Sequence, residues 1–181
     1  AAELNGPHWG VKWPNDLVLG GRKLGGILVE GRMQHALLQR LVVGVGINLV
    51  APPVDVPHAV SWSEWETPPT ADRVRRALVD RLVLGLRTVL ELPSPDLWGF
   101  VSQRYTKILW GLGAPQELSG RTSPEKKHTV LLVGPTEDGR MRVLRDGVPD
   151  VLHQGEWVWS YPLQPTTGAR KDSLSDRPEN Y

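Results

Sequence analysis

The sequence predicts an α+β domain followed by a small β barrel. A β-hairpin pattern opens the chain at residues 11–30, and an apolar repeat of helical spacing fills residues 70–92. Short strand-like runs separated by turn residues follow. We therefore expect a first domain over residues 1–110 and a second over 111–163. Residues 164–181 carry few apolar side chains, which predicts a disordered tail.

The start of the chain predicts three short strands joined by tight turns. Residues 9–13 read as a strand that ends at Pro14-Asn15-Asp16. Proline fixes φ and removes a donor, and Asn and Asp side chains bond locally to turn backbone. Gly20-Gly21 separates the apolar runs 17–19 and 24–30, which is the signal for a two-residue hairpin.

A long strand rich in Val and Leu is expected over residues 37–49, after a turn at residues 31–34. Glycine weakens an ordinary strand, so Gly44 and Gly46 indicate a place where a ligand or another backbone comes close. Tight packing of a neighbouring strand would account for the same two glycines. The sequence leaves both explanations open.

The middle of the chain predicts an irregular loop and then two helices. Five prolines within residues 51–69 forbid a regular element there. Thr70 is an expected N-cap, and the apolar residues after it recur every four positions, which predicts a surface helix with one buried stripe. The residues of this stripe are Val74, Leu78, Leu82 and Leu86. Arg75 and Arg76 are interpreted as part of the solvated face, and residues 96–105 predict a second, shorter helix.

Four short strands are expected in the second domain. They are the runs 115–119, 128–133, 140–145 and 156–161. Asp138-Gly139 and Asp146-Gly147 are turn signals between them. Trp157 and Trp159 alternate, so they share one strand face, and we interpret them as core residues rather than as an interface.

Composition excludes several classes of function. The net charge of +1 gives no argument for a nucleic acid or a membrane surface as partner. No apolar run reaches the roughly 18 residues of a membrane helix, and no signal-peptide pattern is visible. The absence of cysteine excludes disulfides and fits a cytoplasmic protein. Five scattered histidines and no Gly-x-Ser-x-Gly predict neither a metal held by the protein alone nor a hydrolase triad.

The chemistry-bearing residues gather around the predicted hairpin. Two amines, Lys12 and Lys23, and two turn side chains, Asn15 and Asp16, come from neighbouring strand ends. Fixed positive charge beside hydrogen-bonding side chains and bare glycine backbone suits an anionic, nucleotide-sized ligand. The alternative is a hairpin with ordinary surface lysines.

Three segments in order resemble the catalytic domain of biotin protein ligases. They are KWPND at residues 12–16, RKLGGIL at 22–28 and GVGIN at 44–48. The resemblance implies a class II synthetase-like mixed sheet with helices, followed by an SH3-like C-terminal domain. The last strand of that domain typically follows a Gly-Glu pair, which is Gly155-Glu156 in this sequence.

The resemblance also implies a reaction and a set of site residues. Such ligases join biotin to ATP with Mg²⁺, giving biotinyl-5′-AMP, and then transfer the biotinyl group to a lysine of a biotin carboxyl carrier protein. Lys23 would be the catalytic lysine, which contacts both the biotin carboxyl and the phosphoryl group. The other biotin-binding positions would be Gly26, Gly44 and Gly46. The nucleotide-binding positions would be Lys12, Asn15, Asp16, Asn48 and Trp62.

One departure from the family pattern leaves the activity of this chain open. Biotin ligases carry an upstream Thr/Ser-Asn segment and a Gly-Arg-Gly-Arg loop, and neither is in this sequence. We expect the C-terminal part of a ligase, a chain completed in trans, or a chain that has lost the function, and weak binding of biotinyl-AMP by the chain alone. The alternatives are a lipoate-type ligase and a non-catalytic interaction module. A homodimer and an upstream DNA-binding domain stay open.

Overall fold

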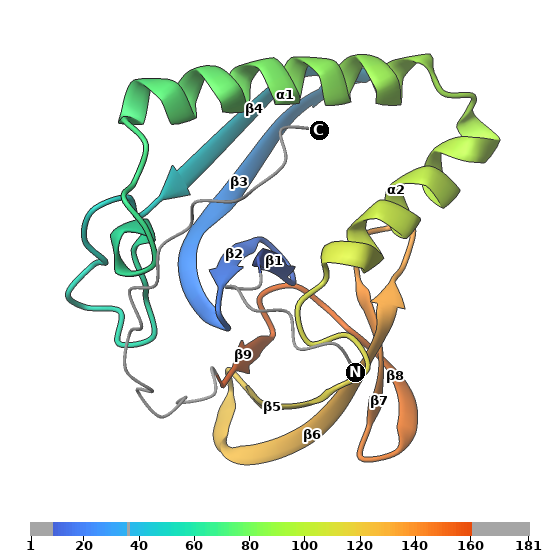
Figure 1. Ribbon diagram of the computed structural model, residues 1–181. Coiled ribbons are helices and arrows are strands. Elements are labelled where there is room, and N and C mark those ends of the chain that lie inside the picture. The colour runs from blue at the N-terminus through green and yellow to red at the C-terminus, as the bar shows by residue number, and fades with distance from the viewer. Residues whose placement is uncertain (1–8, 36, 161–181) are drawn as a thin grey trace.

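The computed structural model describes residues 9–35 and 37–160, which form two antiparallel sheets and two helices (Figure 1). The first sheet has the order β1-β2-β3-β4. Its strands are β1 (Trp9–Lys12), β2 (Asp16–Leu19), β3 (Arg22–Gln34) and β4 (Leu37–Ile47). The helices α1 (Ala71–Glu91) and α2 (Ser94–Ile108) follow. The second sheet has the order β8-β7-β6-β5-β9. Its strands are β5 (Pro115–Gly120), β6 (Ser123–Pro135), β7 (Met141–Arg145), β8 (Val148–Leu152) and β9 (Trp157–Trp159).

The first hairpin forms where the sequence predicts it. Gly20 and Gly21 both have positive φ, 56° and 76°, the conformation that a two-residue turn between β2 and β3 needs. The turn expected at residues 31–34 is wrong. β3 continues to Gln34, which pairs with Leu37 of β4, and His35 has a φ of 49° in the tight turn between them. Continued pairing satisfies the backbone donors and acceptors that an earlier turn would leave exposed.

The loop after β4 is irregular, as predicted, apart from a short 3-10 helix η1 (Trp62–Glu64). The loop nevertheless packs against the first sheet. The N–H of Lys23 donates to the His58 carbonyl at 2.9 Å, and the N–H of Val60 donates to the Lys23 carbonyl at 2.8 Å. Val60 is fully buried with Leu19 and Leu24 in a small core. The loop is therefore fixed beside Lys23.

Helix α1 begins as predicted, because the Thr70 side chain accepts from the N–H of Arg73. The predicted buried stripe is wrong: no described residue of α1 is buried, and Leu82 and Leu86 are 38% and 44% exposed. Figure 1 shows α1 lying across the far ends of β3 and β4, away from the second sheet. Those strand ends also expose apolar side chains, such as Met33. Amphipathic spacing thus identifies a face that the described part of the chain covers only in part, since Val74 and Leu78 are half-buried.

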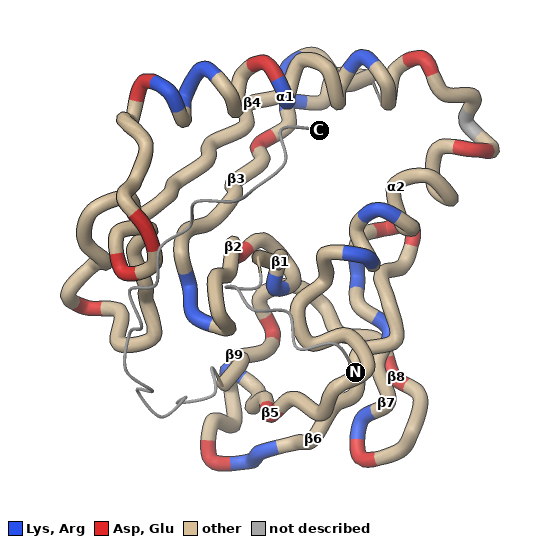
Figure 2. The backbone as a smooth tube through the Cα atoms, in the orientation of Figure 1, with Lys and Arg blue, Asp and Glu red and all other residues tan. Residues whose placement is uncertain are grey.

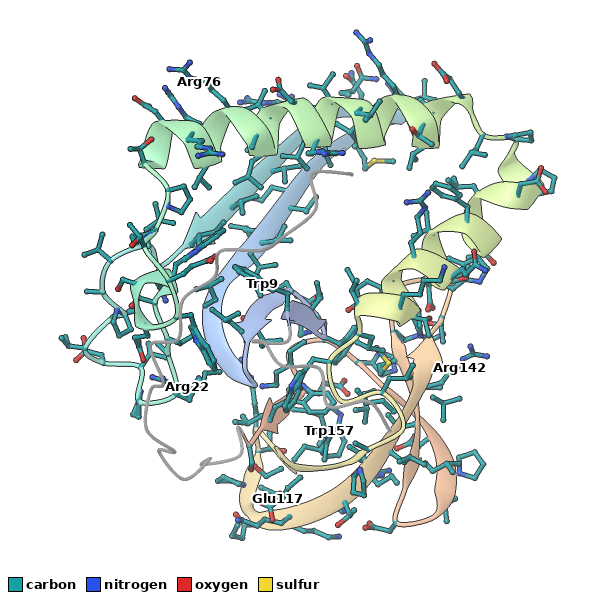
Figure 3. All side chains as sticks on the ribbon, in the orientation of Figure 1. Trp9, Arg22, Arg76, Glu117, Arg142 and Trp157 are labelled. Carbon is teal, nitrogen blue, oxygen red and sulfur yellow. The ribbon has the colours of Figure 1, made fainter. Side chains whose placement is uncertain are left out.

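The charged face of α1 is solvated, as the sequence indicates. Basic and acidic residues alternate along the helix in Figure 2, and Arg75 forms an ion pair with Asp72 at 2.8 Å. Figure 3 shows Arg76 projecting outward from the helix. In the part of the chain that the structure describes, no helix is long and apolar enough to cross a membrane.

A second core fills the five-stranded sheet. Its buried members from the strands are Leu118, Val130, Leu132, Met141, Val143 and Leu152. Trp157 and Trp159 pack at its edge, which confirms their interpretation as core residues. Trp13, from the end of β1, also belongs to this core, and its indole N–H donates to the Gly139 carbonyl at 3.0 Å. The two sheets are therefore joined through the KWPND segment.

The second sheet differs in detail from the predicted one. The strand β8 was not predicted, because Pro149 interrupts its pattern. A closed barrel would need pairing between the two edge strands, β8 and β9. In the described residues these strands do not pair, so the sheet is open. In the first sheet the named strands pair antiparallel, and the parallel pairs are isolated bridges, such as Lys23 with Ala59. The predicted tail, residues 164–181, lies outside the described residues.

Candidate active site

A pocket of about 460 Å³ lies between the turn after β1 and the strands β3 and β4. This volume is within the range of small-molecule sites. The lining residues are Asn15, Asp16, Lys23, Gly26, Ile27, Leu28, Gly44, Val45 and Gly46. The structure thus brings six of the predicted site residues together in one cavity. Three apolar residues, Ile27, Leu28 and Val45, complete its lining.

The charged part of the pocket is an ion pair. Nζ of Lys23 lies 2.6 Å from Oδ1 of Asp16, and the two side chains are 35% and 20% exposed. The hairpin places them there, because Asp16 begins β2 and pairs with Gly26, three residues after Lys23 in β3. Partial burial reduces the screening of this pair by water. The pocket therefore holds a positioned cation that an anionic ligand can reach.

Asn15 fixes the turn that carries Asp16. Its Nδ2 donates to the Ile27 carbonyl at 2.9 Å, and its own carbonyl accepts from the Ile27 N–H at 2.9 Å. This pair of hydrogen bonds ties the turn to the centre of β3. Asn15 therefore has a structural role at the pocket wall in addition to any contact with a ligand.

The glycines of β3 and β4 differ in the space around them. A Cβ on Gly25 would lie 1.9 Å from the Gly46 carbonyl oxygen, so β3 and β4 meet at a distance that only glycine allows there. A Cβ on Gly46 would meet no atom within 4 Å, although Gly46 lines the pocket. A Cβ on Gly26 would contact the Asn15 carbonyl at 3.6 Å. Glycine at positions 26 and 46 therefore leaves the space of the pocket open.

Lys12 lies beside the pocket rather than in its wall. It pairs with Asp16 in the register of β1 and β2, and it is only 4% exposed. Burial lowers the pKa of Lys12 from 10.5 to about 7, with the charge of Asp16 opposing this shift and the charge of Lys23 adding to it. Its Nζ lies 5.7 Å from the centre of the Trp159 ring in the second sheet. Lys12 thus lies between the charged cluster and the second sheet.

Asn48 and Trp62, two further predicted nucleotide-binding residues, also lie outside the pocket. The N–H of Asn48 donates to the Leu24 carbonyl at 2.9 Å, and its Nδ2 donates to the Val60 carbonyl at 3.1 Å. Trp62 packs edge-on against Trp9, with ring centres 4.9 Å apart, and its indole N–H donates to Glu66. These contacts give both residues structural roles. Their role with a nucleotide stays a prediction.

Sequence reasoning missed two residues that hold the surroundings of Lys23. Arg22 forms an ion pair with Glu64 at 2.7 Å and also donates to the Ala59 carbonyl, so it fastens the loop to β3. His58 accepts the Lys23 N–H through its carbonyl. Burial lowers the pKa of its imidazole, and the charges of Lys12 and Lys23 lower it further. Neither role has a local sequence signal, since both depend on pairing between distant segments.

The described residues contain no group of three or more His, Asp or Glu side chains that could hold a metal ion. A divalent cation in this pocket would therefore need oxygen ligands from a bound nucleotide as well as from Asp16 or Asn15.

Comparison with known proteins places these motifs in one family. Residues 1–48 match the model of the biotin/lipoate A/B protein ligase family. Over 140 residues, the chain is 40% identical to the bifunctional ligase/repressor BirA of Escherichia coli. The chain is similar to part of a biotin protein ligase. The resemblance expected from the sequence is thereby confirmed.

The extent of the match to biotin protein ligases is limited. The Escherichia coli alignment covers 76% of this chain and 42% of that relative. A biotin–[acetyl-CoA-carboxylase] ligase of Paracoccus denitrificans is 44% identical over 43 residues, 24% of this chain and 18% of that protein. The chain therefore spans less than half the length of these curated relatives.

The fold agrees with that of solved biotin protein ligases. The biotin protein ligase of Aquifex aeolicus superposes with a TM-score of 0.64 at 23% identity, covering 84% of this chain and 65% of that chain. The same enzyme in complex with biotin and ATP gives a TM-score of 0.62 at 22% identity, with 84% and 62% coverage. At this identity the superposition shows the fold alone.

Proposed function

We propose that this chain forms the part of a biotin protein ligase that carries the catalytic lysine. The complete enzyme joins biotin to ATP and transfers the biotinyl group to a lysine of a biotin carboxyl carrier protein. The pocket that Lys23 and Asp16 share with Gly26, Gly44 and Gly46 is the observation that carries this proposal. Ligases of this family act on biotin, and the motifs that match them line this pocket.

Lys23 is the proposed catalytic residue of the first step. A carboxylate oxygen of biotin attacks the α-phosphorus of ATP, the bond to the β-phosphate oxygen breaks, and pyrophosphate leaves. Two anionic groups must approach each other, so a fixed ammonium between them lowers the barrier. The Lys23 side chain is 35% exposed, so its ammonium can exchange its contact with Asp16 for the biotin carboxylate.

The uncharged wall of the pocket suits the biotin rings. Ile27, Leu28 and Val45 offer apolar contact, and Gly26 and Gly46 leave room for a planar group. The nucleotide side is assigned to Asn15 and Asp16 with Lys12 behind them, together with Asn48 and Trp62 as predicted from the motif. Mg²⁺ would be held between phosphate oxygens and Asp16 and would offset the charge of the pyrophosphate leaving group.

The second step uses the carrier lysine as nucleophile. Its neutral amine attacks the biotinyl carbonyl carbon, the mixed anhydride bond breaks, AMP leaves and the amine loses a proton. The five-stranded sheet after residue 110 is proposed to be the SH3-like domain of the ligase, with residues 1–110 contributing to the catalytic domain. A cytoplasmic location and a homodimer are part of this proposal.

A lipoate-type ligase is the second candidate, because the matching family model covers both biotin and lipoate ligases. The two activities differ in the acid that fills the pocket. Competition between biotin and lipoate for adenylation distinguishes them. The biotin proposal expects lipoate to compete poorly.

The decisive experiment measures pyrophosphate release from ATP with biotin. It uses this chain alone and this chain combined with the N-terminal part of a biotin ligase catalytic domain, which we call the reconstituted enzyme. We expect release from the reconstituted enzyme and little from the chain alone. No release from either, with a correctly folded chain, would contradict the proposal and favour a non-catalytic interaction module.

A further inference from the structure

Trp159 brings the second sheet into contact with the candidate active site. It is the last residue of β9 and pairs with Leu118 of β5, and its ring centre lies 6.3 Å from that of Trp13, which follows β1. The centre of its ring lies 5.7 Å from Nζ of Lys12. Because Lys12 is 4% exposed, the indole covers an ammonium group that is almost fully removed from water.

Charged groups among the described residues face Lys12 from β2, β3 and the loop after β4. Asp16 lies opposite it in the register of β1 and β2, Lys23 comes from β3, and His58 comes from the loop after β4. Lys23 and any positive charge on His58 disfavour the ammonium form of Lys12, whereas Asp16 favours it. The negative face of an indole ring also favours a nearby cation. Trp159 therefore contributes both burial and an attractive surface.

We propose that Trp159 is a positioning residue of the ligase site, which holds the Lys12 ammonium over its ring and keeps water away from it. This inference rests on the proposed function, in which Lys12 serves the nucleotide side of the pocket. The inference adds the second sheet to the site, although no residue of that sheet lines the pocket.

A neighbour on the same strand separates this role from simple core packing. Trp157 lies two residues earlier in β9 and also packs on the second core. Its ring contacts His128, with centres 5.8 Å apart, and Arg145, whose guanidinium lies 5.1 Å from the ring centre. Trp157 is thus also partly buried, and these ring contacts do not involve Lys12. Trp157→Ala is a matched control for Trp159→Ala.

The test measures the titration of Lys12 by NMR in this chain with labelled lysine. In the wild type the pKa of Lys12 is expected near 7, and nuclear Overhauser effects should join its Hε protons to the Trp159 ring. Trp159→Ala admits water, so the pKa should rise well above 7, toward 10.5. Trp157→Ala should leave the titration unchanged. Equal titration of Lys12 in the wild type and Trp159→Ala would overturn the proposal.

A second variant keeps the test decisive if Trp159→Ala does not fold. Trp159→Leu fills the space with an aliphatic group but removes the ring face, so the pKa of Lys12 should fall below its wild-type value, and Trp159→Phe should restore it. An unchanged titration in Trp159→Leu would again contradict the inference. Absence of the wild-type Overhauser effects would do so without any variant.

The reconstituted enzyme supplies the functional readout. Trp159→Ala should raise KM for ATP at least fivefold while KM for biotin changes less than twofold, and Trp159→Phe should reverse this. Equal changes in both KM values would indicate a structural role only and would overturn the inference. If the NMR results hold but no variant or wild type releases pyrophosphate, the proposed function fails, whereas the contact of Trp159 with Lys12 stands.

Discussion

Nζ of Lys23 lies 2.6 Å from Oδ1 of Asp16, and both side chains line the same pocket. The pairing holds the ammonium at a fixed point of the wall before any ligand arrives. An incoming carboxylate therefore meets a cation that is already oriented, and the entropy of ordering a long side chain has been lost in folding rather than in binding.

Replacement of Lys23 should remove the activity and keep the fold. Lys23→Ala leaves the backbone bonds to His58 and Val60 in place, since these involve main-chain atoms. We expect pyrophosphate release by the reconstituted enzyme to fall by about 10²-fold or more, because the transition-state charge loses its cation. Lys127→Ala is the control, since it breaks an exposed ion pair with Glu117 on the second sheet. Normal release from Lys23→Ala would remove the catalytic assignment.

A side chain at position 46 should block the pocket without disturbing the strands. Gly46→Val projects into space that holds no atom within 4 Å of the new Cβ, and β-branched residues suit strands. We expect the midpoint of urea unfolding to change little and biotin affinity in the reconstituted enzyme, measured by calorimetry, to fall roughly tenfold or more. Gly99→Ala, where a Cβ also meets nothing, is the matched control. Undiminished biotin affinity would place the ligand elsewhere.

Burial of Lys12 predicts a specific pH dependence of stability. Its pKa is about 7 in the folded protein and 10.5 ordinarily, so between these values the unfolded chain binds a proton that the folded chain lacks. The free energy of unfolding should therefore rise from pH 7 to about 10, by an amount on the order of 3 kcal/mol. Above pH 10 the rise should end, because burial raises the pKa of Tyr105 from 10.0 to about 12. In that range the Tyr105 hydroxyl loses its proton in the unfolded chain but keeps it in the folded chain, which lowers the free energy of unfolding as pH increases.

Urea unfolding at a series of pH values measures this dependence. Lys12→Met keeps the apolar stem and removes the titrating group, so the rise should disappear in that variant. A wild type whose stability is flat or falls between pH 7 and 10 would show that Lys12 is not desolvated in solution.

Trp13 should contribute to stability through the second core rather than through the first sheet. Trp13→Phe loses the hydrogen bond to the Gly139 carbonyl and part of the ring volume. We expect a loss of about 2 kcal/mol in urea unfolding. Trp65→Phe, at an exposed position in the loop, should cost far less. A similar small effect for Trp13→Phe would mean that the two sheets are not joined as described.

Polar substitution on α1 should be tolerated. Leu82 and Leu86 are more than a third exposed, so Leu82→Gln with Leu86→Gln should change the free energy of unfolding by less than ~0.5 kcal/mol. Leu118→Ala, at a fully buried position, should cost about 3 kcal/mol. A cost for the double variant near that of Leu118→Ala would indicate that another part of the chain covers this face in solution.

Local chemistry explains which parts of the fold were predictable. Gly20-Gly21 determines a tight turn and Thr70 caps a helix through atoms three residues away, so both follow from the sequence. Whether the apolar stripe of α1 is buried does not follow from the sequence, because the spacing shows that the helix is amphipathic but does not show what covers its apolar face. The length of β3 was also missed, since a glycine such as Gly31 suits a paired strand as well as a turn.

The same distinction between local and distant interactions separates the predicted residues of the candidate site from the missed ones. Lys23, Gly26 and Gly46 were identified through contiguous motifs, and the structure brings them into one pocket. His58 and Trp159 escaped prediction, because their places depend on pairing between segments that are far apart in sequence. Motifs predict a site where the chain turns back on itself over a few residues, and they do not predict the segments that surround it.

The insertion of Trp13 into the second core has a consequence for protein engineering. Because Lys12 and Trp13 are consecutive, exchange of the five-stranded sheet between two related chains also exchanges the environment of a charged residue beside the candidate site. A chimera that takes residues 111–160 from another source will need an aromatic ring in place of Trp159 and a carbonyl acceptor in place of Gly139. Exchange of the two halves should therefore succeed only when the exchanged segment supplies the partners of Lys12 and Trp13 as well.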